Sequence, residues 1–564
     1  MSLLQQQWSL QFTPLSPIHL GTGSDYEPGG YVIEEETLFA FNGMAALRVL
    51  SQRDRDELNQ ILSGRANGDM LRQVQSFFHH HRQPLMSVAS HRVRLNASMQ
   101  AFYAERVGRV VQQERTGGRV QNKLEIERTA WNPVTQMAYL PGSGIKGAIR
   151  TALLDTINKG QQLPYDLKRD RQANQKLQED LFKGKFHTDP LRLVAVGDAH
   201  LQANTPFATE VRFALNRKKV AITDAGGTLR QSKAEQQGLY QLLETLPALM
   251  PRAFGGTLSL NTHGSMRVSE QKWPSHEYTL REIASACNRF YLGHFQRECN
   301  LLKRRNYLDE QWHHQVTGLL EGELKQRMER GEVFLLRVGR HSGAESVTLA
   351  GVRNIKIMKG RGDKPDYLPE AKTVWLAGTE RQAQRNLLPF GWLLVEVAAT
   401  EKQLSPWPDS LQNAEITSWI TQWRQREQEL QQQRQKLEAQ RRQEEEKQRQ
   451  LQQQIAAEQA VAAATEAAAS KAEAERQAAL AAMSDEERQL QALKERFEAA
   501  HQAKTLNAGG QVVVDRQALL EAAQQWSPEL QQKAAEVIRQ TLKQQPWSSR
   551  KKKENQDLLQ QLER

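Results

Sequence analysis

The chain has 564 residues, of which 39% are hydrophobic and 25% charged, and its formal net charge is +11. At roughly one domain per 150 residues this length predicts three or four structural units, and the positive excess suggests a polyanionic partner, most often nucleic acid. Two cysteines without a C-x-x-C pair, no apolar run of ~18 residues and no signal-peptide pattern exclude a disulfide scaffold and a membrane span, so we expect a cytoplasmic protein.

The first hundred residues predict strands, a hairpin and short helices. Residues 8–20 alternate in polarity and end in a glycine loop at 21–23. Residues 31–33 and 38–41 flank three glutamates, which predicts a hairpin, and Asn42 is expected to cap a helix over 43–50. The histidines at 79–81 point in different directions on a helix, so we interpret them as a polar helix end and not as a metal site.

The region from Gly108 to Arg128 mixes glycine with basic residues, among them Arg115, Arg119 and Lys123. Such a segment could follow a phosphate backbone, or it could be a solvated surface loop. The sequence leaves both interpretations open.

Residues 139–150 (YLPGSGIKGAIR) form the motif that we call the central motif. The pattern predicts a strand, a turn at Pro141 and Gly142, a glycine-rich loop that carries Lys146, and a helix from Ala148 to Ile157. Backbone N–H groups at such a junction attract anions, which predicts a cradle for phosphate or a nucleic-acid backbone. A nucleotide-binding P-loop is excluded because Lys146 precedes Gly147 and Ala148 occupies the hydroxyl position. A glycine turn without a ligand remains the alternative.

The next 250 residues alternate strands and helices without βαβ regularity, which favours an α+β fold with antiparallel sheets. We expect strands over 191–196, 211–215, 254–260, 333–338 and 393–397, helices over 239–249 and 281–302, and a helix-like stretch at 352–356. Residues 339–343 are a second basic, glycine-rich loop. Cys287 and Cys299 flank His294, and we interpret them as buried thiols, not as metal ligands.

The composition changes near residue 405. Residues 423–482 are mostly Gln, Glu, Arg, Lys and Ala, which predicts one long exposed helix of roughly 90 Å. Its apolar seam is thin, so a spacer, an oligomerisation arm and a docking surface all remain open. A capping box at Ser484 and further helix starts at Asp515 and Ser527 predict a small helical domain, followed by a basic cluster at 550–553.

Three motifs, in this order, resemble the RAMP superfamily of CRISPR effector proteins. They are residues 16–23 (SPIHLGTG), residues 140–150 (LPGSGIKGAIR), and residues 334–339 (FLLRVG) with 388–392 (LPFGW). Within the superfamily, residues 1–400 look most like the type III-A (Csm) subunit at the 3′ end of the guide RNA. The segment after 405 has no counterpart in that family, and the loop at 339–343 is more basic than its pattern.

The resemblance implies two ferredoxin-like, RRM-related domains, over 1–190 and 191–404. The composition predicts that a helical arm (405–483) and a small helical domain with a basic tail (484–564) follow them. It implies glycine-rich loops that grip guide RNA, and no cofactor, metal or catalytic site. It also implies contact with other effector subunits and, indirectly, with target RNA. The residues carried over as RNA-binding are His19, Gly21, Gly142, Ser143, Gly144, Lys146, Gly147, Arg150, Gly339, Arg340 and His341.

Three functions follow as hypotheses: a non-catalytic subunit that caps the guide filament, a RAMP-type endoribonuclease, and an adaptor. The ribonuclease would use His19 as a base near a ribose 2′-OH, with Asp25 six residues away. The adaptor would recruit a partner, such as a host nuclease, through the segment after 405, and deletion of that segment would separate this role from RNA binding.

Overall fold

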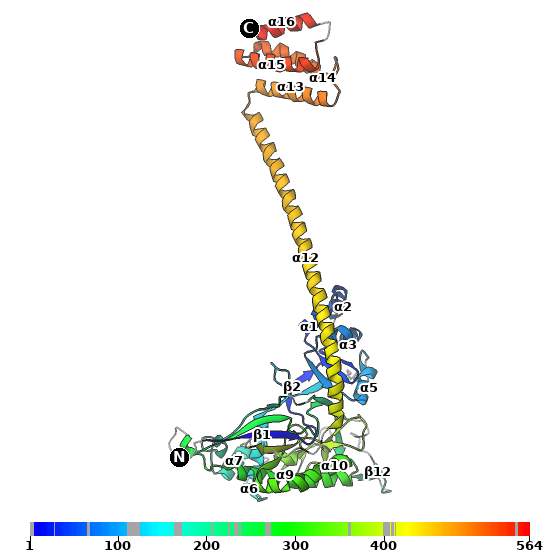
Figure 1. The fold of residues 1–564 in the computed structure, drawn as a ribbon, viewed down its shortest axis with the longest axis vertical. Coiled ribbons are helices and arrows are strands. Elements are labelled where there is room, and N and C mark those ends of the chain that lie inside the picture. Colours follow the sequence, from blue (N-terminus) through cyan, green and yellow to red (C-terminus); the bar gives the residue numbers. More distant parts are fainter. Residues whose placement is uncertain are drawn as a thin grey trace. The chain divides into compact units, whose positions relative to one another are not determined.

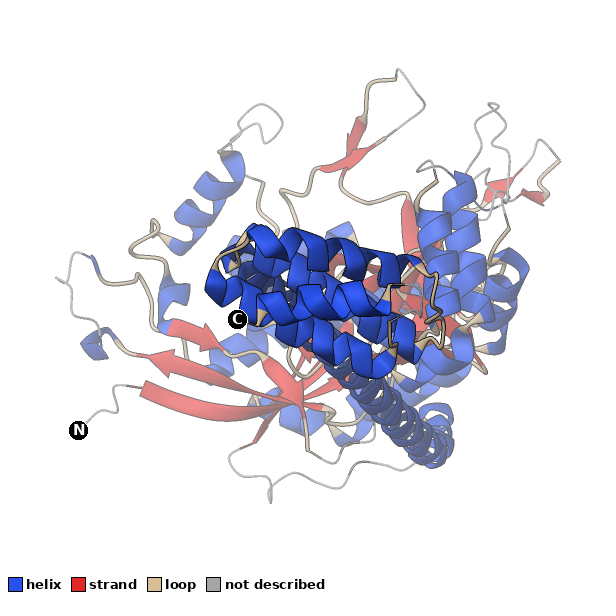
Figure 2. Ribbon diagram, turned by 90° about the horizontal axis from the view of Figure 1, so that it is seen from above, coloured by secondary structure: helices blue, strands red, loops and turns tan. Residues whose placement is uncertain are grey.

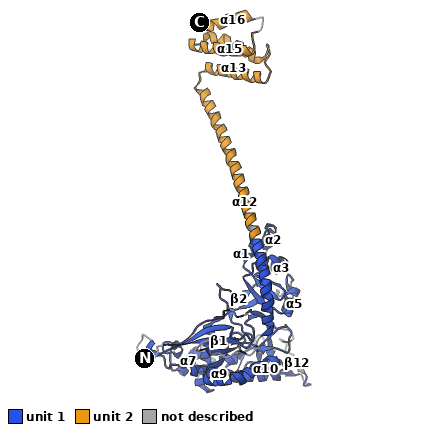
Figure 3. Ribbon diagram, in the orientation of Figure 1, with its two compact units in different colours: residues 1–438 blue, residues 439–564 orange. Residues whose placement is uncertain are grey.

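The computed structural model describes residues 5–27, 29–64, 68–109, 124–162, 172–203, 205, 207–223, 226–230, 235, 239–265, 272–358, 363–398, 407, 411, 413–547 and 551–563. The chain forms two compact units, Met1–Glu438 and Ala439–Arg564 (Figure 3). Strands and helices are interspersed in the first unit, and the described residues of the second are helical (Figure 2).

The first sheet of unit 1 is antiparallel throughout and has the strand order β15-β20-β1-β14-β9-β7, with β8 also paired to β14. The alternation that predicted a strand at the N-terminus places Leu10 and Phe12 in the core. Its strands are β1 (Gln5–Pro14), β7 (Tyr139–Leu140), β8 (Val194–Val196), β9 (Ala199–Leu201), β14 (Phe254–Asn261), β15 (Val333–Arg337) and β20 (Trp392–Ala398).

Two long helices, α6 (Gly142–Asn158) and α9 (Leu280–Arg304), pack on this sheet and on each other (Figure 1). A capping box between Thr279 and Glu282 starts α9, and Asn288 of α9 bonds the backbone of β15 through Val333 O (2.9 Å) and Leu335 N (3.0 Å). Nearby elements are α7 (Ala173–Phe182), α10 (Glu310–Gly318), α11 (Lys325–Arg330), the π-helical turn Leu319–Glu323 and the 3₁₀ turns Pro190–Leu193, His263–Ser265 and Ala344–Val347.

The second sheet has the order β2-β6-β13-β10-β5-β4-β3, and β18 pairs both β10 and β19. Its strands are β2 (Gly21–Tyr26), β3 (Tyr31–Glu34), β4 (Thr37–Ala40), β5 (His91–Arg94), β6 (Ile126–Thr129), β10 (Glu210–Lys218), β13 (Tyr240–Thr245), β18 (Thr373–Gly378) and β19 (Leu388–Pro389). Helices α1 (Gly43–Val49), α2 (Gln52–Leu62), α3 (Gly68–His80), α4 (Arg82–Ser87) and α5 (Ala97–Arg106) accompany it, and two small ribbons pair β11 (Ile222–Thr223) with β12 (Leu229–Arg230) and β16 (Ile355–Ile357) with β17 (Asp366–Leu368).

The mixed α/β architecture, the N-terminal hairpin, the Asn42 cap and the long helix after residue 280 are confirmed. Two helix predictions are wrong, because residues 240–245 form β13 and residues 355–357 form β16. The glycine loop predicted at 21–23 is also wrong, because these residues lie in β2. Both sheets draw strands from each side of residue 190, and the division into two ferredoxin-like domains stays a prediction.

Helix α12 (Ala414–Ala482) confirms the long helix, but its beginning is part of the core of unit 1. Ile416 and Ile420 are buried in the main core, and Leu430 is buried in a second cluster. Ion pairs join this part of the helix to β5: Arg94 bonds Glu415 (3.1 Å) and Arg92 bonds Glu427 (3.4 Å). A deletion from residue 405 therefore removes core side chains together with the arm.

Unit 2 contains the rest of α12 and a small helical domain. The helices are α13 (Asp485–Gln502), α14 (Gln511–Ala522), α15 (Pro528–Gln544) and α16 (Lys552–Leu562), with a 3₁₀ turn at Ala523–Gln525. The Ser484 capping box and the start at Pro528 are confirmed, whereas Asp515 lies inside α14 and does not start it. Leu490, Phe497, Leu520 and Ile538 form its separate core.

Candidate nucleic-acid interface

Three segments that are far apart in the sequence meet around Leu20. Its backbone N–H donates to Thr129 Oγ1 of β6 (3.0 Å), and the preceding carbonyl, that of His19, accepts from Arg340 N–H (2.8 Å). A Cβ built on Gly339 would lie 3.5 Å from Leu20 Cδ2, and one built on Gly144 would lie 3.9 Å from the same atom. The structure thus brings together three motifs that are separate in the sequence.

The close approach of these three segments requires glycine at position 339. Its φ is +80°, a left-handed conformation that glycine adopts readily, and a Cβ there would lie 2.3 Å from the His19 carbonyl oxygen. A side chain at this position would push the loop after β15 away from residues 19 and 20.

The central motif is a helix start and not a loop, which corrects the expectation that the helix begins at Ala148. Helix α6 begins at Gly142, directly after Pro141. A Cβ on Gly142 would lie 2.3 Å from Val196 O, so glycine allows α6 to approach the turn between β8 and β9. From that turn, Asp198 Oδ1 accepts from the Gly142 N–H (2.7 Å) and already satisfies one donor of the helix N-terminus.

The remaining residues of the motif lie mostly on the surface of α6. Ser143, Gly144 and Gly147 are exposed, and a Cβ on Gly147 would meet nothing within 4 Å. The side chain of Lys146 is half-buried, and burial followed by the charge of Arg150 lowers its pKa. No ion pair engages the Lys146 ammonium among the described residues.

The guanidinium of Arg150 has partners within the protein. Its guanidinium donates to Asp189 Oδ2 (2.6 Å) and to Gln178 Oε1 (3.1 Å), and it lies 5.3 Å from the centre of the Phe182 ring. These bonds fasten α6 to α7 and to the segment before Pro190.

His19 is buried, with none of its surface exposed. Its Nδ1–H donates to the Glu244 carbonyl (2.7 Å), while its Nε2 has no partner and faces Gly21, whose Cβ would lie 3.2 Å away. Burial is the largest effect on its pKa and lowers it, so the ring is neutral at pH 7. Gly21 itself is exposed at the start of β2, together with Thr22 to Asp25.

A buried carboxylate, which sequence reasoning missed, supports this corner. Glu244 of β13 accepts from Thr209 Oγ1 (2.7 Å), Thr129 N–H (3.1 Å) and His91 Nε2 (3.2 Å). Burial raises its pKa, but the bond to His91 and the other donors outweigh that effect and hold the pKa below its usual value. The sequence signal is a charged residue within the apolar stretch 239–249, whose composition predicts a helix.

The loop after β15 supplies one surface cation and one partly buried ring. Arg340 is 39% exposed and pairs with Glu127 of β6. His341 stacks on Trp375 (ring centres 4.6 Å apart) and bonds Gln241 Oε1 through Nε2 (2.8 Å). Burial and the charge of Arg340 lower the pKa of His341 to about 3, so this ring is neutral and serves packing.

Two further sequence expectations fall elsewhere. The basic loop with Arg115, Arg119 and Lys123 lies outside the described residues, although Arg128 is described and stacks on Trp131 (3.8 Å) and Tyr26 (4.6 Å). The second expectation concerns the histidines at 79–81, of which His81 forms a group with the carboxylates Asp54 and Glu57 of α2. Asp54 also closes the capping box of α2.

Residues 11–286 match the family model of the RAMP superfamily, which confirms the resemblance inferred from the motifs. This stretch runs from β1 into α9 and includes the first and central motifs. No curated protein matches the sequence. No helix in the described parts of the chain is long and apolar enough to cross a membrane.

Several solved structures match this chain, and two of them are described below. One is a chain of the Csm–crRNA–target RNA ternary complex of a type III-A CRISPR-Cas system, with 16% identity, a TM-score of 0.43, and coverage of 69% of this chain and 100% of that chain. The other is Csm5 of T. onnurineus, with 14% identity, a TM-score of 0.38, and coverage of 68% and 99%. At these identities and TM-scores neither alignment assigns a function.

Proposed function

We propose that this chain is a non-catalytic RNA-binding subunit of a type III-A CRISPR effector complex, which grips the guide RNA backbone near its 3′ end and caps the filament of backbone subunits. The observation that carries the proposal is the meeting of three glycine motifs around Leu20 in a RAMP-related unit. Exposed glycines allow a sugar-phosphate backbone to approach closely, Arg340 lies next to Gly339, and Lys146 is a half-buried cation of the central motif.

The distribution of charge supports this assignment. Lys and Arg are equal in number to Asp and Glu over residues 439–564, so the net charge of +11 lies entirely within residues 1–438. We call the surface around Gly21, Gly144 and Gly339 the glycine surface. The unit that contains it is therefore the one that attracts a polyanion. Binding through the backbone would be sensitive to salt and largely independent of sequence.

A ribonuclease that uses His19 is less well supported. A general base must come within hydrogen-bond reach of the 2′-OH, about 2.6–3.2 Å. The His19 ring is buried, and its Nδ1 is engaged by the Glu244 carbonyl. Asp25 is exposed on β2. The geometry of the described residues thus favours a structural role for His19, in which it joins β13 to the first motif.

The test is to co-express the chain with the other subunits of its complex and to sequence the RNA that purifies with it. Lys146→Ala should lower the amount of guide RNA per complex by roughly tenfold at moderate salt, because a phosphate contact is lost. Arg449→Ala is the matched control, since it removes one exposed cation from α12. His19→Ala should leave any cleavage of added RNA unchanged.

Two results would contradict the proposal. Guide RNA retained equally by Lys146→Ala and by the control would remove the central motif from the interface. RNA cleavage that is present in the wild type and abolished by His19→Ala would establish the ribonuclease instead.

A further inference from the structure

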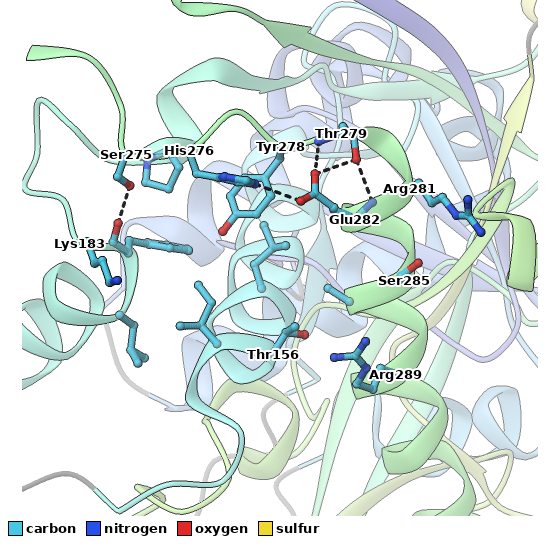
Figure 4. Close-up of a pocket in the computed structure, with 16 residues that line it drawn as sticks. Thr156, Lys183, Ser275, His276, Tyr278, Thr279, Arg281, Glu282, Ser285 and Arg289 are labelled. Atoms are coloured by element: carbon cyan, nitrogen blue, oxygen red, sulfur yellow. Dashed lines mark hydrogen bonds and ion pairs between the residues drawn. The ribbon is translucent and has the colours of Figure 1, made fainter. Parts of the chain in front are cut away.

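A pocket of about 640 Å³ lies between α6, α7 and α9 in unit 1 (Figure 4). Its volume is within the roughly 300–1,000 Å³ of sites that hold a ligand or a side-chain anchor. The walls are mainly apolar, with polar groups around the opening. The apolar lining comes from Leu153, Ile157, Leu181, Phe182, Pro190 and Ala286.

This pocket is separate from the glycine surface, although both use α6. Gly144 and Leu153 are nine residues apart, which at 3.6 residues per turn places them roughly 180° apart around the helix. Arg150 braces the pocket, because it binds Asp189 next to Pro190 and lies over the ring of Phe182. This explains why a motif residue that the sequence suggested for RNA is held by a carboxylate.

The rim of the pocket is positively charged. Lys183, Arg281 and Arg289 are exposed at the pocket, and none of the three has an ion pair among the described residues. The one carboxylate that lines the pocket, Glu282, is occupied: it accepts from Thr279 N–H and Oγ1 (both 2.7 Å) and from His276 Nε2 (3.1 Å), as the dashed lines in Figure 4 show. The opening therefore presents three cations against one carboxylate and is net positive.

We infer that this pocket binds an acidic segment of another protein subunit, whose bulky apolar side chain enters the cavity while flanking Asp or Glu residues pair with Lys183, Arg281 and Arg289. The inference rests on the proposed function, because it requires a complex of several proteins. An apolar anchor within a charged rim is the usual anatomy of such contacts. Charge complementarity selects an acidic partner, and it also suppresses basic ones.

RNA is disfavoured as the occupant. A base of single-stranded RNA is held in a pocket chiefly by stacking on an exposed aromatic face. In this pocket the ring of Phe182 is 4% exposed and covered by Arg150, and Tyr278 is half-buried with His276 edge-on to it (4.6 Å). Aliphatic side chains of α6 and α7 make up most of the remaining wall, and these suit Leu, Met or Phe from a protein.

The test uses the full chain in its co-expressed complex, with photoreactive benzoylphenylalanine in place of Ile157, which lines the pocket and is 37% exposed. The matched control carries the same group in place of the exposed Val461 of α12. The expected product at position 157 is a cross-link to one co-expressed subunit, within a peptide that has a bulky apolar residue and at least two carboxylates within four positions of it. The control should not give this product.

A charge reversal completes the experiment. Lys183→Glu with Arg289→Glu should reduce the cross-link from position 157 at least tenfold, while the guide RNA per chain stays unchanged and reports that unit 1 is folded. Cross-linking to RNA, a yield no higher than the control, or a yield unchanged by the reversal would each overturn the inference. Loss of RNA in Lys146→Ala tests the proposed function separately, because that residue does not line the pocket.

Discussion

At the scale of single residues, glycines in one motif have opposite structural roles. Gly142 has no room for a methyl group against the β8–β9 turn, whereas Gly147 is surrounded by open space. The sequence motif could not distinguish them, because the distinction depends on Val196, which is 54 residues further along the chain. The motif could predict only that another part of the protein or a ligand can approach this segment closely.

These two glycines predict opposite effects of one substitution. Gly142→Ala should destabilise unit 1 by about 1–3 kcal/mol, because its Cβ would lie 2.3 Å from Val196 O. Gly147→Ala should stabilise it by about 0.5–1 kcal/mol, since alanine is the better helix former at a position with free space. Urea unfolding midpoints of the two variants measure the difference, and shifts of the same sign would show that α6 does not start at Gly142.

A buried histidine should make stability depend on pH. Burial, together with Arg297, Arg353 and Arg337 and against the effect of Glu345, lowers the pKa of His294 to about 3. The unfolded chain binds this proton near pH 6.5, so below that value unfolding takes up a proton and stability falls with pH. Acidification from pH 7 to pH 5 should therefore remove about 2 kcal/mol through this residue.

The check compares unfolding at the two pH values in the wild type and in His294→Gln. The variant should lose about 2 kcal/mol less on acidification than the wild type. His314→Gln, which changes an exposed histidine on α10, should behave as the wild type. An equal loss in His294→Gln would mean that another group carries the dependence.

At the scale of elements, the sequence correctly predicted helix starts, because a helix cap depends on residues close together in the chain. Asn42 accepts from Ala45 N–H (2.7 Å), and Ser484 and Thr279 close capping boxes, as their residue types suggested. The errors lie where distant strands decide. Residues 240–245 have helical composition, yet β13 is held between β10 and β6. In the candidate site, the sequence predicted the three motifs but not Glu244, which contacts two of its partners through strands that meet only in the fold.

Helix α12 shows the same division between local and distant control. Its composition predicted a long helix, but not that its first turns complete the core of unit 1. A chain that ends at Glu438 should keep unit 1 folded, whereas a chain that ends at Asn413 loses Ile416, Ile420 and Leu430. At about 1.5–3 kcal/mol for each buried side chain, the shorter chain should lose roughly 5 kcal/mol or more.

Thermal unfolding of the two truncated chains checks this prediction. The control is the full chain with Ile416→Ala and Ile420→Ala, which keeps the arm and removes only its anchors. Its unfolding temperature should fall toward that of the chain ending at Asn413. Equal stability of all three proteins would mean that the arm begins near residue 405, as the composition alone suggested.

At the scale of the whole molecule, the division of charge separates two tasks. Unit 1 carries the net charge, the glycine surface and the cation-rimmed pocket, whereas unit 2 is formally neutral and has its own core. A neutral helical module on a neutral helix is typical of a spacer or a protein-docking element. RNA binding by unit 1 and protein docking by unit 2 are therefore expected to be separable by truncation.

The salt dependence of RNA binding tests this separation. Each phosphate that a protein neutralises adds about 0.9 to the slope of log K against log salt for duplex DNA, and about 0.7 for a single strand. Because residues 439–564 carry no net charge, the full chain and the chain ending at Glu438 should give the same slope with one single-stranded RNA. Lys146→Ala should lower the slope by the value of one phosphate contact, about 0.7, in both chains. A lower slope in the truncated chain alone would show that unit 2 contacts RNA, most directly through the lysines at 551–553, and would reject the division of tasks.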